Sequence, residues 1–386
     1  MKNKCIKSKK IVKSKRNSAI EILRLFSMFL IVIHHYAVHG TYPLAVNSGG
    51  EIGSVDHAFL FLHFIGRVGV VLFVLIGAYF LCEKRFNFTR PVRLIGETYF
   101  YSWLIFLVIM HFMPGLINDV YGKDVWNQVL YPFLIPSPYW FVTSYLVMLL
   151  MMPVLNRVIN SLTLKQLGLL NVLLFVLLSI IPCLNIIMPR KEFDPTQVGF
   201  STGAVFLFLY LVAAFIRQLE VYQIKHQNIM LVSLIILCMG GVIAIILNTN
   251  SKSQFNNINQ IIELYNPICI VVSVALFTVI KSFRFQISFV NFIAESTFAI
   301  YLITDNPLLR KLIWFQWFPS GTTFGDAKQF LLLGVKGTLV VFGFSILIDI
   351  LFRIVGVKSL VNRFSNYISV ILTNFYVKYQ NNKSQK

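Results

Sequence analysis

Apolar residues in this chain gather in runs of about 20, and most of the charged residues lie between these runs. A helix needs about 20 apolar residues to cross the hydrocarbon core of a bilayer. Ten runs reach that length, at residues 19–38, 58–82, 94–113, 138–156, 164–188, 199–217, 228–248, 264–282, 287–304 and 329–352. The pattern predicts an all-α fold, a polytopic integral membrane bundle of about ten transmembrane helices.

The composition supports a membrane protein. Hydrophobic residues make up 57% of the 386 residues and charged residues only 13%, whereas a soluble domain is about 25% charged. The five cysteines are scattered, with no spacing typical of metal ligands or of a disulfide framework. We therefore expect no metal site.

The net charge of +19 could suggest nucleic-acid binding, but its distribution indicates membrane topology instead. If the N-terminus is cytoplasmic and the ten spans alternate, 24 of the 34 Lys and Arg residues fall in cytoplasmic segments. This is the positive-inside rule. We expect both termini in the cytoplasm, the lipid bilayer as a partner, no nucleic-acid partner, and a multi-pass protein of the cell membrane.

Three parts follow along the chain. Residues 1–18 form a basic cytoplasmic tail, residues 19–353 a transmembrane domain, and residues 354–386 an amphipathic basic cytoplasmic tail. The tail before the first span, together with that span, is interpreted as an uncleaved signal anchor. Aromatic residues before the fourth span are typical of an anchoring belt at the membrane surface, namely Trp126, Tyr131, Tyr139 and Trp140.

The first span carries the most informative polar residues. Arg24 and His35 are eleven residues apart, which places them within about 20° on one helix face and about 16 Å apart along the axis. Residues on this stripe also include Met28 and His39, whereas His34 lies about 100° away and is expected to face elsewhere. An ionisable group inside a membrane helix is costly and marks a functional site by default. The alternative is a structural hydrogen bond from each histidine to a neighbouring helix.

Two further spans carry charged residues. His63 and Arg67 in the second span are expected at a depth similar to that of His35. Arg90 and Arg93 at the start of the third span suit a polyanion such as a nucleotide phosphate. They could equally be topology residues, with Arg93 paired to Glu97.

Glu295 lies inside the ninth span and is a candidate for function, or for the counter-ion of Arg24. A neutral imidazole can take a proton from a hydroxyl that attacks an acyl carbonyl. We therefore take His35, Arg24 and Glu295 as the candidate catalytic residues.

Four segments of the chain resemble the acyltransferase-3 family of polytopic membrane proteins, which O-acylate surface polysaccharides and related glycans. The family's Arg-x10-His pattern corresponds to Arg24 and His35, and its Arg-x-x-Arg element to Arg90 and Arg93. The segments "GRVGVVLFVLIGAYFL", "YWFVTSYLVMLLMMPVLN" and "ESTFAIYLITDNP" resemble its later motifs. Two departures are Gly77-Ala78, where the family usually has Ser-Gly, and Thr304, where it often has histidine.

The resemblance implies an O-acyltransferase, in particular an O-acetyltransferase. A cytoplasmic acyl-CoA, acetyl-CoA above all, would bind with its phosphates against Arg24, Arg90 and Arg93. His35 would act as general base or hold the acyl group transiently. The acceptor would be a sugar hydroxyl on an extracytoplasmic or lipid-linked glycan.

The substrate side of the site is then expected to include His34, His63 and Arg67, with no metal. Another large O-acyltransferase family also uses an intramembrane histidine, but late in its chain, where the spans here have none. From a different class, a polysaccharide flippase or small-molecule exporter stays an alternative. Such transporters commonly show internal repeats and matched broken spans, which we do not find in this sequence.

Overall fold

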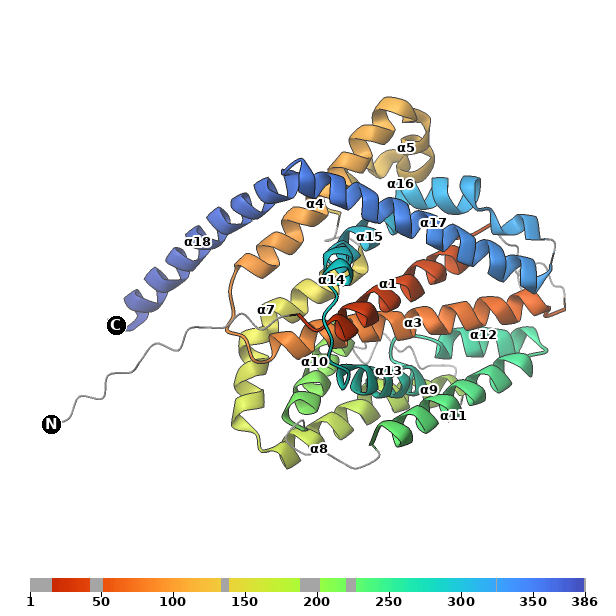
Figure 1. The fold of residues 1–386 in the computed structure, drawn as a ribbon, viewed down its shortest axis with the longest axis horizontal. Coiled ribbons are helices and arrows are strands. Elements are labelled where there is room, and N and C mark those ends of the chain that lie inside the picture. The colour runs from red at the N-terminus through yellow and green to blue at the C-terminus, as the bar shows by residue number, and fades with distance from the viewer. Residues whose placement is uncertain are drawn as a thin grey trace.

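The computed structural model describes residues 16–41, 51–132, 139–187, 202–219, 227–323 and 325–384, and these residues form helices joined by turns (Figure 1). Residues 1–15 of the predicted N-terminal tail lie outside the described residues. Within these residues, eight helices are long and apolar enough to cross a membrane, and two shorter apolar helices accompany them. The described part of the chain is therefore an all-helical bundle of the kind found in polytopic membrane proteins.

The ten predicted spans correspond to helices or helix pairs whose ends differ from the predicted ones by a few residues. They are α1 (Ser18–Val38), α3 (Ser54–Leu81), α4 (Thr89–Phe112), α7 (Trp140–Ser161), α8 (Leu164–Phe175) continued by η2 (Val176–Ile180) and α9 (Ile181–Ile187), α10 (Thr202–Leu219), α11 (Gln227–Leu247), α13 (Pro267–Lys281), α14 (Ser288–Ala294) with α15 (Thr297–Thr304), and α17 (Ala327–Ile354).

Helices α1 and α3 form the centre of the bundle, between α17 on one side and α13 on the other (Figure 1). Asn17 caps α1 by accepting a hydrogen bond from the backbone N–H of Ala19 at 3.2 Å. The two helices approach closely at Gly66, where an added methyl group would overlap the ring of His34. This contact fixes the spacing of the helices that carry most of the polar groups.

Helices at the periphery of the bundle expose much of their apolar surface instead of burying it. Leu237 on α11 is 74% exposed, and α11 buries little of its apolar surface in the protein. An exposed apolar face of this kind on a helix of spanning length suits contact with lipid. The connections between the long helices contain four shorter helices: α5 (Pro114–Tyr121), η1 (Gly122–Asp124), α6 (Val125–Leu130) and α12 (Lys252–Ile261).

The predicted ninth span is two helices rather than one. The helix breaks at Glu295 and Ser296, between α14 and α15. Arg353 of α17 fills the break: it donates to the carbonyl of Phe292 at 3.0 Å, to Glu295 at 3.1 Å and to Ser296 at 2.7 Å. These bonds satisfy groups that a membrane helix could not leave unpaired.

The segment after α15 comprises α16 (Pro307–Arg310), η4 (Lys311–Trp317) and η5 (Ser320–Thr323). Beyond it, α17 ends at Ile354, and Gly356, with φ 85°, turns the chain into α18 (Val357–Ser384). Helix α18 packs along α4 and runs toward the C-terminal end of the chain (Figure 1). The predicted cytoplasmic tail is thus a long helix that docks on the bundle at its beginning.

Candidate active site

Two cavities lie one behind the other along α1. The first, of about 430 Å³, is called the histidine cavity and is lined by Met28, Ile31, His34, His35, Val38, His39, His63, Arg67, Val70, Phe73, Trp140, Phe141, Phe298, Tyr301, Asp305 and Arg310. The second, of about 670 Å³, is called the arginine cavity and is lined by Arg16, Arg24, Phe73, Gly77, Arg93, Leu94, Glu97, Phe141, Tyr145, Ala294, Glu295, Thr297, Phe298, Arg353, Lys358, Ser359 and Asn362. His35 and Arg24 therefore line different cavities.

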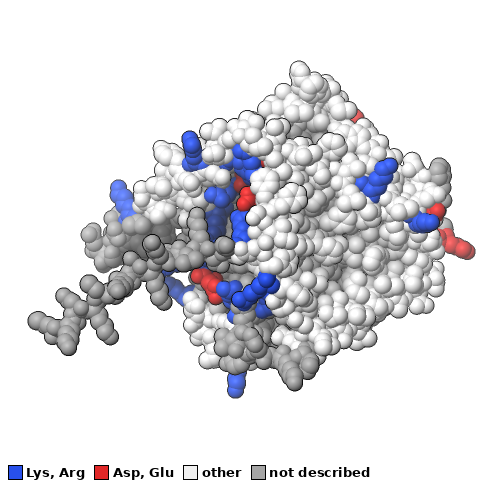
Figure 2. Space-filling view, in the orientation of Figure 1, with Lys and Arg blue, Asp and Glu red and all other residues white. Residues whose placement is uncertain are grey.

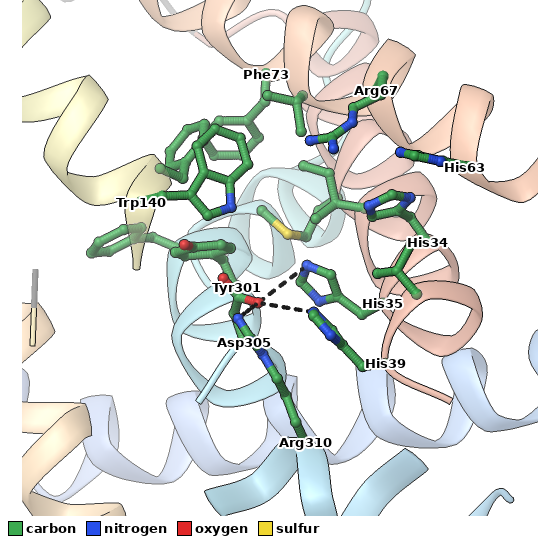
Figure 3. A pocket seen from close by; sticks show the side chains of 16 residues that line it. His34, His35, His39, His63, Arg67, Phe73, Trp140, Tyr301, Asp305 and Arg310 are labelled. Carbon is green, nitrogen blue, oxygen red and sulfur yellow. Dashed lines mark hydrogen bonds and ion pairs between the residues drawn. The ribbon is translucent and has the colours of Figure 1, made fainter. Parts of the chain in front are cut away.

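His35 lies at the centre of the histidine cavity and faces Asp305 from the end of α15 (Figure 3). Its Nε2 is 3.4 Å from Asp305 Oδ1, and both residues are buried. The Nδ1 atom of His35 has no hydrogen-bond partner in the described part of the chain. An imidazole held on one side by a carboxylate and unpartnered on the other is arranged to accept a proton.

Asp305 is the centre of a charged cluster. Arg310, one turn further on, donates to Asp305 Oδ1 at 2.5 Å, and His39 Nε2 lies 3.9 Å from the same oxygen. Arg310 itself lines the histidine cavity. Asn306 begins α16 by capping it, which directs the first turn of this helix, and with it Arg310, back toward the cavity.

His34 also lines this cavity, so the prediction that it faces elsewhere is wrong. Its ring lies 5.0 Å from that of His63 and 6.1 Å from that of His35, centroid to centroid. The cavity extends around α1 into the α1–α3 interface, where Gly66 leaves room for the His34 ring. A helix position 100° from a stripe can therefore still face the same cavity.

The other side of the cavity is bounded by a polar segment near α12. His63 Nδ1 lies 2.9 Å from Asn259 Oδ1, and Arg67 forms an ion pair with Glu263 at 2.9 Å. The structure thus brings His34, His35, His63 and Arg67 into one cavity.

His35, His39 and Asp305 offer ligand atoms within 4.8 Å of one another, which is close enough to hold a metal ion. The charges around them argue against a cation, because Arg310 already bonds to the carboxylate and Arg67 lines the same cavity. The arrangement suits proton transfer better than metal coordination.

The arginine cavity has a different chemistry. Its lining includes five cationic side chains, Arg16, Arg24, Arg93, Arg353 and Lys358, and two carboxylates, Glu97 and Glu295. Figure 2 shows blue and red side chains gathered in and around a hollow on a face that is otherwise mostly white, with a few more charged side chains near its edges. Such an excess of guanidinium and ammonium groups favours a polyanion.

One sequence interpretation of this region is wrong. Glu295 is not the counter-ion of Arg24: it pairs with Arg16 at 2.7 Å and with Arg353 at 3.1 Å, whereas Arg24 pairs with Glu21 at 3.0 Å on its own helix. The contacts form this way because Glu295 lies at the helix break, facing α17. Glu295 lines the arginine cavity and His35 the histidine cavity, and the catalytic role of Glu295 stays a prediction.

The predicted Arg90–Arg93 pair is divided. Arg93 lines the arginine cavity, but Arg90 donates to the carbonyl of Arg85 at 3.2 Å and does not line it. Arg90 lies in the first turn of α4, three residues before Arg93, and its side chain folds back over the preceding turn. Arg353, which also lines the arginine cavity, forms an ion pair with Asp349 at 3.1 Å on its own helix.

Three phenylalanines line both cavities and form the partition between them: Phe73, Phe141 and Phe298. The rings of Phe73 and Phe141 meet edge to face with centroids 5.7 Å apart, and Phe141 lies 5.3 Å from Tyr301. Gly77 makes space beside this partition for Tyr145, whose hydroxyl would be 2.5 Å from a methyl group at position 77. We call these three residues the phenylalanine partition.

Several residues in and around the site were not predicted from the sequence as site residues. Asp305 was not among the predicted site residues, and Trp140 was assigned to an anchoring belt although it lines the histidine cavity. Tyr139, placed in the same belt, is buried and donates to the carbonyl of Leu302 at 2.9 Å. The sequence offered one indication of a role for Asp305, namely that this aspartate directly follows an apolar run. That position did not indicate that Asp305 pairs with His35.

The described residues thus form an all-helical bundle with a buried His–Asp pair in one cavity and a cationic cavity next to it, an arrangement that suits a membrane enzyme. The acyltransferase-3 family model, described as an acyltransferase domain, matches residues 17–350. The chain belongs to this family, as the sequence resemblance indicated, and is a membrane acyltransferase. The comparison with curated proteins gave no significant match, and neither did the comparison with solved structures.

Proposed function

We propose that the protein is an O-acetyltransferase of the cell membrane, which moves an acetyl group from cytoplasmic acetyl-CoA to a sugar hydroxyl on an extracytoplasmic or lipid-linked glycan. The observation that carries the proposal is the succession of a cationic cavity and a His–Asp cavity along α1, with the phenylalanine partition between them.

The arginine cavity is the donor site. Arg24 and Arg93 bind the phosphates of the coenzyme, because guanidinium groups form charge-assisted hydrogen bonds with phosphate oxygens. Arg24 and His35 are eleven residues apart on α1, so the two ends of the path are separated by about 16 Å along the helix. The thin pantetheine arm crosses the partition and presents the thioester to the histidine cavity.

The transfer step takes place at His35. His35 Nδ1 removes the proton from the acceptor hydroxyl as the hydroxyl oxygen attacks the thioester carbonyl. The tetrahedral intermediate collapses, the C–S bond breaks, and the coenzyme leaves as a thiolate that takes the proton from the imidazolium. Asp305 positions the ring and stabilises its positive charge during the step.

The acceptor site is the opposite wall of the histidine cavity, at His34, His63 and Arg67. Polar groups there form hydrogen bonds with sugar hydroxyls, and Trp140 offers an aromatic surface of the kind that packs on a sugar ring. Positive-inside topology supports this direction, since it assigns the arginine cavity to the cytoplasmic end of α1.

Mass analysis of surface glycans tests the proposal. Cells with the wild-type protein should carry acetyl groups that are lost on deletion of the gene and on substitution His35→Ala at equal protein level in the membrane. Acetylation that persists with His35→Ala would contradict the catalytic assignment. Acetylation that is unaffected by deletion would contradict the proposed reaction.

A further inference from the structure

The beginning of α18 lies outside the part of the chain that matches the acyltransferase-3 family model, but its residues line the arginine cavity. The family model ends at residue 350, six residues before the turn at Gly356. Lys358, Ser359 and Asn362 nevertheless line the arginine cavity. The charged site therefore extends into a segment that the family resemblance does not cover.

The first part of α18 is fixed in place by contacts with α4 and α17. Lys358 Nζ lies 2.7 Å from the buried Asp349, which Tyr101 of α4 also approaches at 2.6 Å. Gly96 of α4 admits α18 closely, because an added methyl group there would come within 3.3 Å of Ser365 Oγ. Ser369 lies 2.9 Å from Thr89, one turn further along. The helix thus forms a preformed wall of the cavity.

Polar groups of this wall are available to a ligand. The Oδ1 atom of Asn362 is buried and has no hydrogen-bond partner in the described ranges. The ammonium group of Lys358 has three donors, and its ion pair with Asp349 uses one of them. An unpaired buried amide oxygen is unfavourable because it has lost its hydrogen bonds to water, and a bound hydrogen-bond donor would replace them.

We infer that α18 completes the donor site, with Lys358, Ser359 and Asn362 binding the nucleotide end of the acyl-CoA, its 3′-phosphorylated ADP. The inference rests on the proposed function. The three residues of the phenylalanine partition line both cavities, whereas no described residue of α18 lines the histidine cavity. The thioester is directed toward the partition, so the opposite end of the coenzyme meets α18. A phosphate suits the ammonium of Lys358, and the adenine amino group is a donor that suits Asn362 Oδ1.

Binding measurements on the full-length protein in detergent test this inference. We compare wild type, Lys358→Ala and the double variant Ser359→Ala/Asn362→Ala, using CoA and 4′-phosphopantetheine, which lacks the nucleotide, as probes. The control is Arg363→Ala, which removes an exposed cation from the same helix, outside the cavity. Thermal unfolding in detergent checks that each variant is folded.

Both test variants should bind CoA about tenfold more weakly, as expected for the loss of one charge-assisted hydrogen bond. The control should bind CoA like the wild type, and 4′-phosphopantetheine should bind all four proteins alike. The double variant keeps the Lys358–Asp349 ion pair, so it separates a lost ligand contact from a disturbed fold.

CoA binding unchanged in both test variants would overturn the inference, and so would an equal loss for both probes, because a structural role would not distinguish them. If the wild type acetylates glycan and binds CoA, and the test variants bind CoA as tightly as the wild type does, only the proposed role of α18 is contradicted. A wild type that binds no CoA would overturn the donor site and the proposed function together.

Discussion

Substitution of Asp305 by asparagine tests the catalytic arrangement most directly. Asparagine keeps the size of the side chain and an oxygen that can accept the hydrogen bond from Arg310. It removes the negative charge that lies 3.4 Å from His35 Nε2. The substitution therefore separates the electrostatic role of Asp305 from its place in the packing.

The distance sets the size of the effect. Two unit charges 3.4 Å apart attract by about 5 kcal/mol at an effective dielectric constant of about 20. Arg310 offsets part of the field of Asp305, because it bonds to the same carboxylate oxygen. We therefore expect a loss of about 3–4 kcal/mol in the stabilisation of the imidazolium, which lowers kcat by about 10²- to 10³-fold.

The assay follows CoA release from acetyl-CoA by purified protein in nanodiscs, with cell-envelope glycan as acceptor. The KM for acetyl-CoA should change less than kcat, because Asp305 lines the histidine cavity and not the arginine cavity, where the donor is proposed to bind. Asp326→Asn is the matched control, since Asp326 is an exposed carboxylate that caps α17 and lines neither cavity. A kcat above half the wild-type value for Asp305→Asn in folded protein would refute the role of the His–Asp pair.

The remaining predictions concern the partition, the helix contact, the acceptor wall and the absence of a metal requirement. Phe298→Ala should widen the passage and increase turnover of butyryl-CoA relative to acetyl-CoA at least about fivefold, measured by competition; an unchanged ratio would contradict a gating role. Gly66→Ala should destabilise the protein by about 1–3 kcal/mol through overpacking against His34, while Gly240→Ala, where the added methyl group has open space, should not lower the melting temperature in detergent. His34→Ala should raise the KM for glycan more than the KM for acetyl-CoA, and the reverse pattern would remove His34 from the acceptor wall. EDTA and phenanthroline should leave activity unchanged, and reactivation of chelated protein by Zn²⁺ would contradict the assignment of the His–His–Asp group to proton transfer.

The helices of this fold could be predicted from hydropathy because lipid imposes one requirement on every spanning segment. The first predicted span, 19–38, differs by one residue from α1 at Ser18–Val38. Prediction was less successful at residues 287–304, where the apolar run continues across a break in the helix. Hydropathy does not record the break, since the groups that satisfy its backbone come from Arg353, almost sixty residues further on.

The site could be predicted only where its residues share one helix. Helical periodicity placed Met28, Ile31, His35 and His39 on one stripe, and all four line the histidine cavity. The same rule misassigned His34, because periodicity gives a direction on α1 and not the position of α3. Asp305 could not be paired with His35 from the sequence, since 270 residues separate two groups that only the packing of α15 against α1 brings together.

The two departures from the family pattern acquire a structural meaning here. Position 77 must stay small, because Tyr145 occupies the space in front of it. Thr304, where the family often has histidine, turns its hydroxyl back to the carbonyl of Ile300 at 2.9 Å and offers nothing to the cavity. The next residue, Asp305, reaches His35 instead, so in this chain the end of α15 contributes a carboxylate to the site.

A partition of aromatic rings between the two cavities could meet two opposing requirements of an acyltransferase whose donor and acceptor bind in separate cavities. The passage must admit the coenzyme arm, and it must exclude water. A path open enough for the coenzyme arm would also admit water, which competes with the acceptor for the thioester. No hydrogen bond holds a phenylalanine ring, so a threading chain could displace these rings, and the contacts of Phe141 with Phe73 (edge to face) and with Tyr301 (tilted) would close the passage again. Under the proposed function, the phenylalanine partition would account for the separation of Arg24 from His35: the donor would bind in one cavity, the transfer would take place in the other, and only the arm that carries the acetyl group would pass between them.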